Sequence, residues 1–234
     1  MRGRWILPLG LLVISGCASQ NPQPGRVGNP TVDVGQLAKT DIDRVAEAHQ
    51  RELIASLRVI AEKLYRRNPR EWRKGGQPSL EAALARIFDP GSRWSFSELD
   101  GRRGTDALHL AFREDYRGDR VLALMGGLGG MLMTAFNEKT EFFILDDLDP
   151  QKLYNSARNV EIAVWKLSNA RDPDGNPILL SNEGGTPQNL SFEREFGKMI
   201  GNLDLLSKLV ADKNNRTIVR MVQNLATAIF LPVK

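Results

Sequence analysis

Apolar residues recur at three- and four-residue intervals along most of the chain, the pattern of amphipathic helices. The longest such stretch begins behind Thr40, a typical N-cap residue, and ends before Pro69. We expect six further helices, over residues 79–88, 105–112, 120–136, 150–167, 191–210 and 217–230. This pattern predicts a mainly α fold, a single irregular helical bundle of about seven helices.

Local signals set several of the predicted boundaries. Asp149-Pro150 is a cap followed by a proline at the first helical position, and Ser191 is expected to cap the next helix. Residues 141–145 are mostly aromatic and branched, which indicates a buried strand and leaves room for one short β-hairpin. The last predicted helix, over residues 217–230, has its apolar positions at Ile218, Met221, Val222, Leu225 and Ile229.

The first residues have a different pattern. Arg2 and Arg4 precede a ten-residue apolar run from Trp5 to Ile14, with small residues behind it. Ten residues span only about 15 Å as a helix, whereas a membrane span needs about 20 residues. Residues 1–16 are therefore predicted to be a cleaved secretory signal.

The motif Ile14-Ser15-Gly16-Cys17 resembles the lipobox of bacterial lipoproteins. The resemblance implies that the sulfur of Cys17 receives a diacylglyceryl group, that the chain is cut before Cys17, and that acyl chains such as palmitate anchor it in a membrane. Ala18-Ser19 follows, without an aspartate, and this resembles sorting to the periplasmic face of the outer membrane. The alternative is an ordinary secretory leader with a coincidental cysteine.

Composition supports a folded body on a tether. Residues 17–39 are rich in Asn, Gln, Pro and Gly and are predicted to form a flexible linker, so the helical domain is expected over residues 40–234. Cys17 is the only cysteine, so the chain has no intramolecular disulfide and must rely on a packed core. Loss of the leader lowers the net charge from +4 to about +2, which together with the predicted compartment argues against nucleic acid as a partner.

The segment Val121–Phe136 is the most unusual one, because sixteen residues without a charge contain four glycines. Each glycine destabilises a helix interior by about 1 kcal/mol relative to alanine. Close packing in a central helix is one explanation; a pocket for an apolar ligand or a segment that dips into a membrane are the others. The residues concerned are Met125, Gly126, Gly127, Gly129, Gly130, Met131 and Met133.

A basic cluster follows the first helix and surrounds Trp72. It consists of Arg66, Arg67, Arg70, Arg73 and Lys74, with Glu71 as its single acid. Cations at a helix C-terminus are favoured by the helix dipole, so a solvated helix end accounts for the cluster. The alternative is contact with anionic groups, which arginine binds through its planar fork.

Signals for catalysis or metal binding are weak. Asp172 and Glu183 have the spacing of a calcium loop, but Pro177 replaces the required glycine, so a turn is predicted instead. His49 is expected in the core and His109 on the polar side of a short helix. No zinc motif, nucleophile elbow or phosphate loop is present, and no cofactor or metal is expected. The acids kept as candidates for a hydrolase are Glu98, Asp100, Glu193 and Glu195.

Three hypotheses for function remain. The first is a membrane-anchored, non-enzymatic binding or assembly factor with a protein partner in the cell envelope. The second is a carrier or sensor of an apolar ligand, which rests on the glycine- and methionine-rich helix. The third is a cell-wall hydrolase that uses one or two of the acids.

Overall fold

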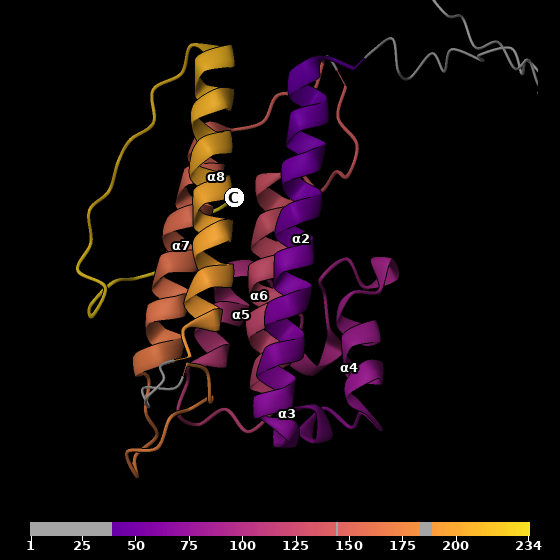
Figure 1. Ribbon diagram of the computed structural model, residues 1–234, viewed down its shortest axis with the longest axis vertical. Helices are drawn as coiled ribbons and strands as arrows, with labels where there is room; N and C mark the ends of the chain where they lie inside the picture. Colours follow the sequence, from indigo (N-terminus) through magenta and orange to yellow (C-terminus); the bar gives the residue numbers. More distant parts are fainter. Residues whose placement is uncertain (1–38, 144, 183–188) are drawn as a thin grey trace, which may run out of the picture. The chain divides into compact units, whose positions relative to one another are not determined.

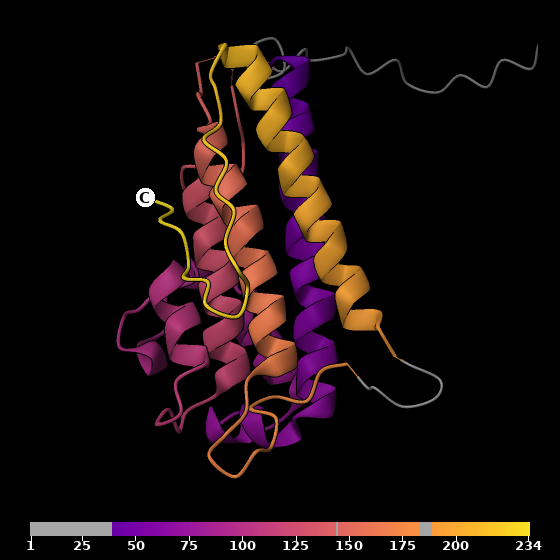
Figure 2. The same ribbon diagram turned by 90° about the vertical axis from the view of Figure 1, so that its left-hand side faces the viewer.

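Four long helices lie side by side in the computed structural model, which describes residues 39–143, 145–182 and 189–234 (Figures 1 and 2). Helices α2 and α7 each pack against both α6 and α8, so the four close around one core. Successive helices of the four run in opposite directions. They are α2 (Asp41–Arg67), α6 (Arg120–Ala135), α7 (Pro150–Asn169) and α8 (Ser191–Asn214).

Shorter elements cover α6 on the side away from α8. Helix α5 packs along α6, and α3 and α4 contact both α2 and α6. With these three, the described part of the chain contains seven α-helices and no strand, which confirms the mainly α prediction. The short elements are α3 (Pro69–Lys74), α4 (Leu80–Ile87), α5 (Gly104–Ala111) and two 3₁₀ turns, η1 (Pro90–Ser92) and η2 (Ser97–Leu99).

Most predicted helix starts are present. The Thr40 hydroxyl accepts from the Asp43 N–H at 3.3 Å, while the Asp43 carboxylate accepts from the Thr40 N–H at 2.7 Å, a complete capping box. Asp149 caps α7. The prediction for Ser191 is wrong in detail: this residue is the first of α8, and its N–H donates to the side chain of Asn189.

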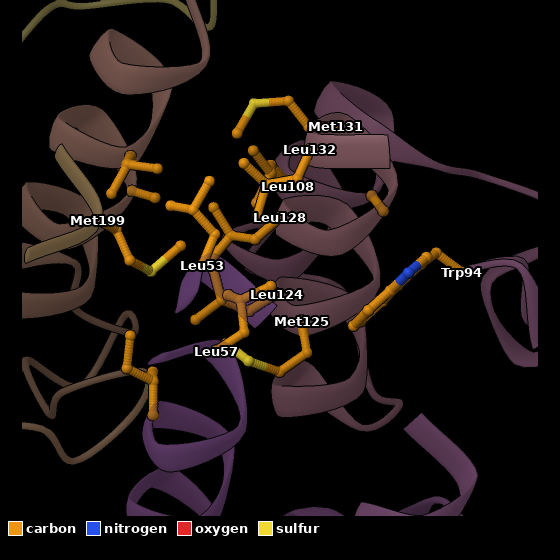
Figure 3. Packing of buried hydrophobic residues seen from close by; sticks show 14 of the residues in the cluster. Leu53, Leu57, Trp94, Leu108, Leu124, Met125, Leu128, Met131, Leu132 and Met199 are labelled. Carbon is orange, nitrogen blue, oxygen red and sulfur yellow. The ribbon is translucent and has the colours of Figure 1, made fainter. Parts of the chain in front are cut away.

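The glycines of α6 allow helix α5 to approach its backbone closely. A β-carbon on Gly127 would lie 2.8 Å from the Leu108 backbone nitrogen of α5, and one on Gly130 would lie 3.0 Å from the Gly104 nitrogen. Real β-carbons rarely come this near, so only glycine permits this helix pair. On the other side of α6 the core side chains of α2 and α8 converge (Figure 3).

Trp94 fills the space beside Gly129 (Figure 3). A β-carbon there would lie 2.0 Å from the indole ring. The loop reaches this position with Arg93 and Trp94 both in the left-handed region, at φ 47° and 57°. Such conformations are unfavourable for residues other than glycine, and burial of the indole offsets their cost.

Two predictions about the end of the chain and its middle were wrong. Residues 217–230 contain no helix, and they run instead as an extended segment with a short turn. The described part of 141–145 forms no strand: Phe142 is buried against Phe136, and its N–H donates to Glu47 at 2.9 Å. The number of helices still agrees with the prediction, because one helix that was not predicted, α3, is present and the last predicted helix is absent.

We predict that Gly129→Ala destabilises the fold by about 1–3 kcal/mol, because its β-carbon would overlap the Trp94 indole. Gly201→Ala on α8 is the control, since nothing lies within 4 Å of the position its β-carbon would take. That change should stabilise the protein by about 0.5–1 kcal/mol. Denaturant unfolding of both variants measures the difference, and equal effects would contradict the close packing.

Candidate functional site

The glycine- and methionine-rich helix singled out in the sequence lies in the core. Gly126, Gly127, Gly129 and Gly130 are buried, and Met125 and Met131 are buried as well, while Met133 is partly exposed. Side chains of neighbouring elements occupy the space beside each glycine. This packing leaves the apolar-ligand hypothesis without a cavity to support it along this helix. No helix among the described residues has both the length and the apolar character of a membrane span.

A buried polar network holds the start of α6. The Asp119 side chain accepts from the N–H groups of Val121 and Leu122 at 2.9 and 3.0 Å, and from the Tyr65 hydroxyl at 2.7 Å. Glu71 of α3 accepts from the Arg120 N–H at 2.8 Å. Both carboxylates therefore serve the N-terminus of a helix, where the dipole favours negative charge.

The Arg120 guanidinium closes the same network. It is nearly buried and donates to four backbone carbonyl oxygens at the end of α5 and in the turn that precedes α6. These acceptors belong to Ala111, Arg113, Glu114 and Tyr116. A guanidinium used in this way is structural, because its donors are already occupied.

Burial raises the pKa of the Asp119 carboxyl to about 6, although the hydrogen bonds from Leu122 and Tyr65 act in the opposite direction. A raised pKa is a property of many catalytic acids. Here the side chain is only 4% exposed and its oxygens face Tyr65 and the first turn of α6. The network therefore explains the shift without a substrate.

The basic cluster lies at the C-terminal end of α2 and on α3. Arg66 pairs with Glu62 at 2.8 Å, Lys74 pairs with Glu71 at 2.5 Å, and Arg67 is partly buried and also has an interaction. The remaining two are exposed: the Arg73 guanidinium stacks 4.8 Å from the Trp72 ring centroid, and Arg70 has no ion-pair partner among the described residues. The structure thus brings the five predicted cations to one end of the bundle, where Arg70 and Arg73 present free donors.

A shallow hollow of about 240 Å³ lies on α5, where Arg102, Asp106, His109, Leu110 and Arg113 line it. His109 is exposed, as predicted, and its ring meets the edge of Phe230 at 5.0 Å between centroids. The two arginines pair with neighbouring acids, Arg102 at 3.9 Å and Arg113 more closely. Acids beside the hollow therefore already engage both of its arginines.

The acids considered for a hydrolase are held by basic or polar neighbours. Burial acts to raise the pKa of Glu98, but hydrogen bonds, above all from Arg86, hold it below its ordinary value, the opposite of a general acid. Glu195 is buried and pairs with Lys198 at 3.0 Å. Glu193 accepts from Ser168 and Asn182, and Asp100 is an exposed turn residue beside Arg102.

The other polar residues have structural partners too. His49 bonds through Nδ1 to the Asn202 side chain, which joins α2 to α8. The predicted turn is present at Asp172, whose carboxylate accepts from the N–H groups of Asp174 and Asn176 at 3.0 and 2.8 Å. Glu183 of the calcium-loop pattern lies outside the described residues, as does Cys17. Within the described ranges, no three His, Cys, Asp or Glu side chains come together as a metal site.

Sequence reasoning missed the most unusual surface, the C-terminal strap, which we define as residues 215–234. Amide side chains hold its backbone against α7. Gln151 accepts from the Val219 N–H at 2.8 Å and donates to the Val219 carbonyl at 3.1 Å; Asn159 does the same for Leu231 at 2.6 and 2.8 Å. Gln and Asn four or eight residues apart on α7 were the only signal available in the sequence.

The strap turns large apolar side chains toward solvent. Val222 is 99% exposed and Val219 is 69% exposed, while Met221 and Leu225 are partly exposed. Ala228, Phe230 and Leu231 near the end of the strap are instead buried. Several large apolar side chains exposed within one short segment indicate an interaction site.

Compared with known proteins, the chain matches no protein-family model, no curated protein and no solved structure.

We predict that the wild type becomes less stable relative to Asp119→Asn as the pH rises from 4 to 7. The folded state binds the Asp119 proton more tightly than the unfolded state, so this contribution is present below pH 4 and is lost as the pH rises through about 6. A shift of two pKa units corresponds to about 3 kcal/mol. Asparagine keeps the capping oxygen. Urea unfolding across this pH range measures the difference, and parallel profiles would show that Asp119 titrates normally.

Proposed function

We propose that this protein is a lipid-anchored lipoprotein of the periplasmic face of the outer membrane, and that it acts as a non-enzymatic binding or assembly factor of the cell envelope. The lipobox at Cys17 supports the location. Two or more acyl chains on that residue would hold the protein stably in a membrane, which a single chain does not.

One observation carries the binding role: α2 separates the anchored end of the body from the basic cluster. The chain from Cys17 enters α2 at Asp41, while Arg66 and Arg67 occupy its last turn. A helix of 27 residues is roughly 40 Å long. The body therefore presents its exposed cations at the far end of α2, away from the attachment of the tether.

The chemistry of that end suits an acidic surface of an envelope protein. Arg70 and Arg73 are exposed and lie three positions apart on α3, so both can reach one partner. Arginine forms bidentate contacts with carboxylates, which makes it effective at such interfaces. Trp72 lies between them and adds apolar area beside the charges.

The other two hypotheses receive no specific support. The surroundings of α6 are filled, which argues against an apolar carrier. Asp119, a carboxyl whose pKa is raised, is committed to the start of α6 rather than to a cleft. A role in binding remains the one that the exposed charged groups favour.

We predict that Cys17→Ser abolishes metabolic labelling of the protein with a fatty acid, because serine lacks the acylated sulfur. The variant should also move from the membrane pellet to the soluble periplasmic fraction after a high-salt wash. Ser19→Ala, two residues away, is the control and should retain the label. Continued labelling of Cys17→Ser would contradict lipid anchorage at this residue.

We predict that the double variant Arg70→Glu/Arg73→Glu loses its envelope partner. A photo-crosslinking residue at position 66 should capture one protein in cells, and the double charge reversal should reduce that capture by tenfold or more, about 1.4 kcal/mol. The control, Arg44→Glu/Arg51→Glu, makes the same charge change near the other end of α2. Equal capture by the two variants, or no captured protein at all, would show that the basic cluster is not the binding surface.

A further inference from the structure

The exposed part of the strap, residues 216–227, has the sequence of an amphipathic helix although it is not helical here. We call these residues the C-terminal lobe. On a helical wheel, Ile218, Met221, Val222 and Leu225 would share one face. Arg216, Arg220, Gln223 and Thr227 would share the opposite face. The helical pattern therefore remains available to the lobe in another environment.

Few contacts hold the lobe in its observed conformation. Gln151 bonds the backbone of Val219, and the Tyr154 hydroxyl donates to the Met221 carbonyl at 3.3 Å. Arg216 also pairs with Asp147 at 2.7 Å, and Gln223 bonds the backbone of Ile229. These bonds are exposed to water, so their net contribution is small. The chain on either side is fixed more firmly, by α8 before the lobe and by Asn159 and buried Leu231 behind it. The lobe can thus leave α7 while both of its ends stay attached.

The charge of this region indicates an anionic partner. From residue 213 to the end of the chain there are four basic residues and no acidic residue. They are Lys213, Arg216, Arg220 and Lys234. A short helix with one apolar face and a basic polar face is the kind that lies in the surface of a bilayer and favours anionic lipids. A protein partner would need a groove whose shape fits these particular side chains. A lipid surface requires no such fit.

The lobe also begins at the anchored end of the body. Lys213 at the end of α8 lies 3.7 Å from Asp43 in the first turn of α2, where the chain from Cys17 enters. Figure 2 shows the strap leaving α8 beside the start of α2. A membrane held by Cys17 is therefore within reach of the lobe, and in this respect the inference rests on the proposed function.

We infer that the C-terminal lobe leaves Gln151 and lies as an amphipathic helix in the surface of an anionic lipid bilayer. Val222 and its apolar neighbours enter the lipid, Arg216 exchanges its ion pair with Asp147 for the headgroups, and Arg220 contacts the headgroups as well. The anchored protein thereby gains a second membrane contact, which orients the body and turns the basic end of α2 and α3 toward the periplasm.

The test uses the mature chain from residue 17 with Cys17→Ser, which removes both the acyl anchor and the only cysteine. A single cysteine is then introduced as Val222→Cys and labelled with an environment-sensitive fluorophore. Vesicles of phosphatidylglycerol and phosphatidylcholine should shift the emission to the blue and raise the helical circular dichroism signal. Vesicles of phosphatidylcholine alone should bind at least tenfold more weakly, since each basic residue near an anionic surface contributes about fivefold.

Two matched variants locate the contact. Val222→Glu should lower the affinity for anionic vesicles at least tenfold without a change in stability, because Val222 touches little in the folded state. Val59→Glu, which alters an exposed valine on α2, should leave the affinity unchanged. Gln151→Ala should raise the affinity severalfold, because the lobe is then released more easily.

The outcomes separate this inference from the proposed function. No binding to anionic vesicles, a fluorophore at position 222 that stays in water, or equal effects of the two valine variants would overturn it. Capture of a single envelope protein from position 222 in cells, without lipid, would overturn it too and would leave the anchor at Cys17 standing. Loss of acyl labelling bears on Cys17 alone, since the vesicle assay uses a chain that carries no acyl group.

Discussion

The close approach that the glycines of α6 permit is the constraint on which the rest of the body depends. Gly127 and Gly130 bring α5 against the backbone of α6, and Gly129 provides the space for the Trp94 indole. Because α6 contacts α2, α3, α4, α5 and α7, it is the element that joins the four long helices to the shorter ones. The glycines weaken the helix locally, and burial on nearly all sides restores it.

Two buried carboxylates fix the position of the first turn of α6, although burial of a carboxylate is normally unfavourable. Asp119 and Glu71 are buried carboxylates, and each accepts from backbone N–H groups of the first turn. Their burial makes ionisation of Asp119 more difficult, as its raised pKa shows. The same residues join α2, α3 and α6, so the end of the bundle that carries the basic cluster is rigidly supported.

Amide side chains hold the parts of the chain that are not helical. Gln151, Asn159 and Gln223 each bond both the N–H and the carbonyl of one residue in the strap, and Asn68 does so for Leu180. Such pairs imitate the bonds of a neighbouring strand. They satisfy backbone groups that a helix would satisfy internally, and this allows the strap to stay extended with its apolar residues turned outward.

The sequence by itself determined the helices whose apolar stripes, caps and prolines agree, such as α2 behind Thr40 and α7 behind Asp149. It also indicated that the glycines of α6 have a role in close packing or binding. It could not predict that residues 217–230 are extended, because a helix of about fourteen residues is marginal in water and amide groups distant in the chain decide the outcome. Nor could it show that Trp94 lies against Gly129, or that Arg70 is exposed while Lys74 is paired. Periodicity reports which face of a helix is apolar, whereas only the tertiary structure decides what covers that face.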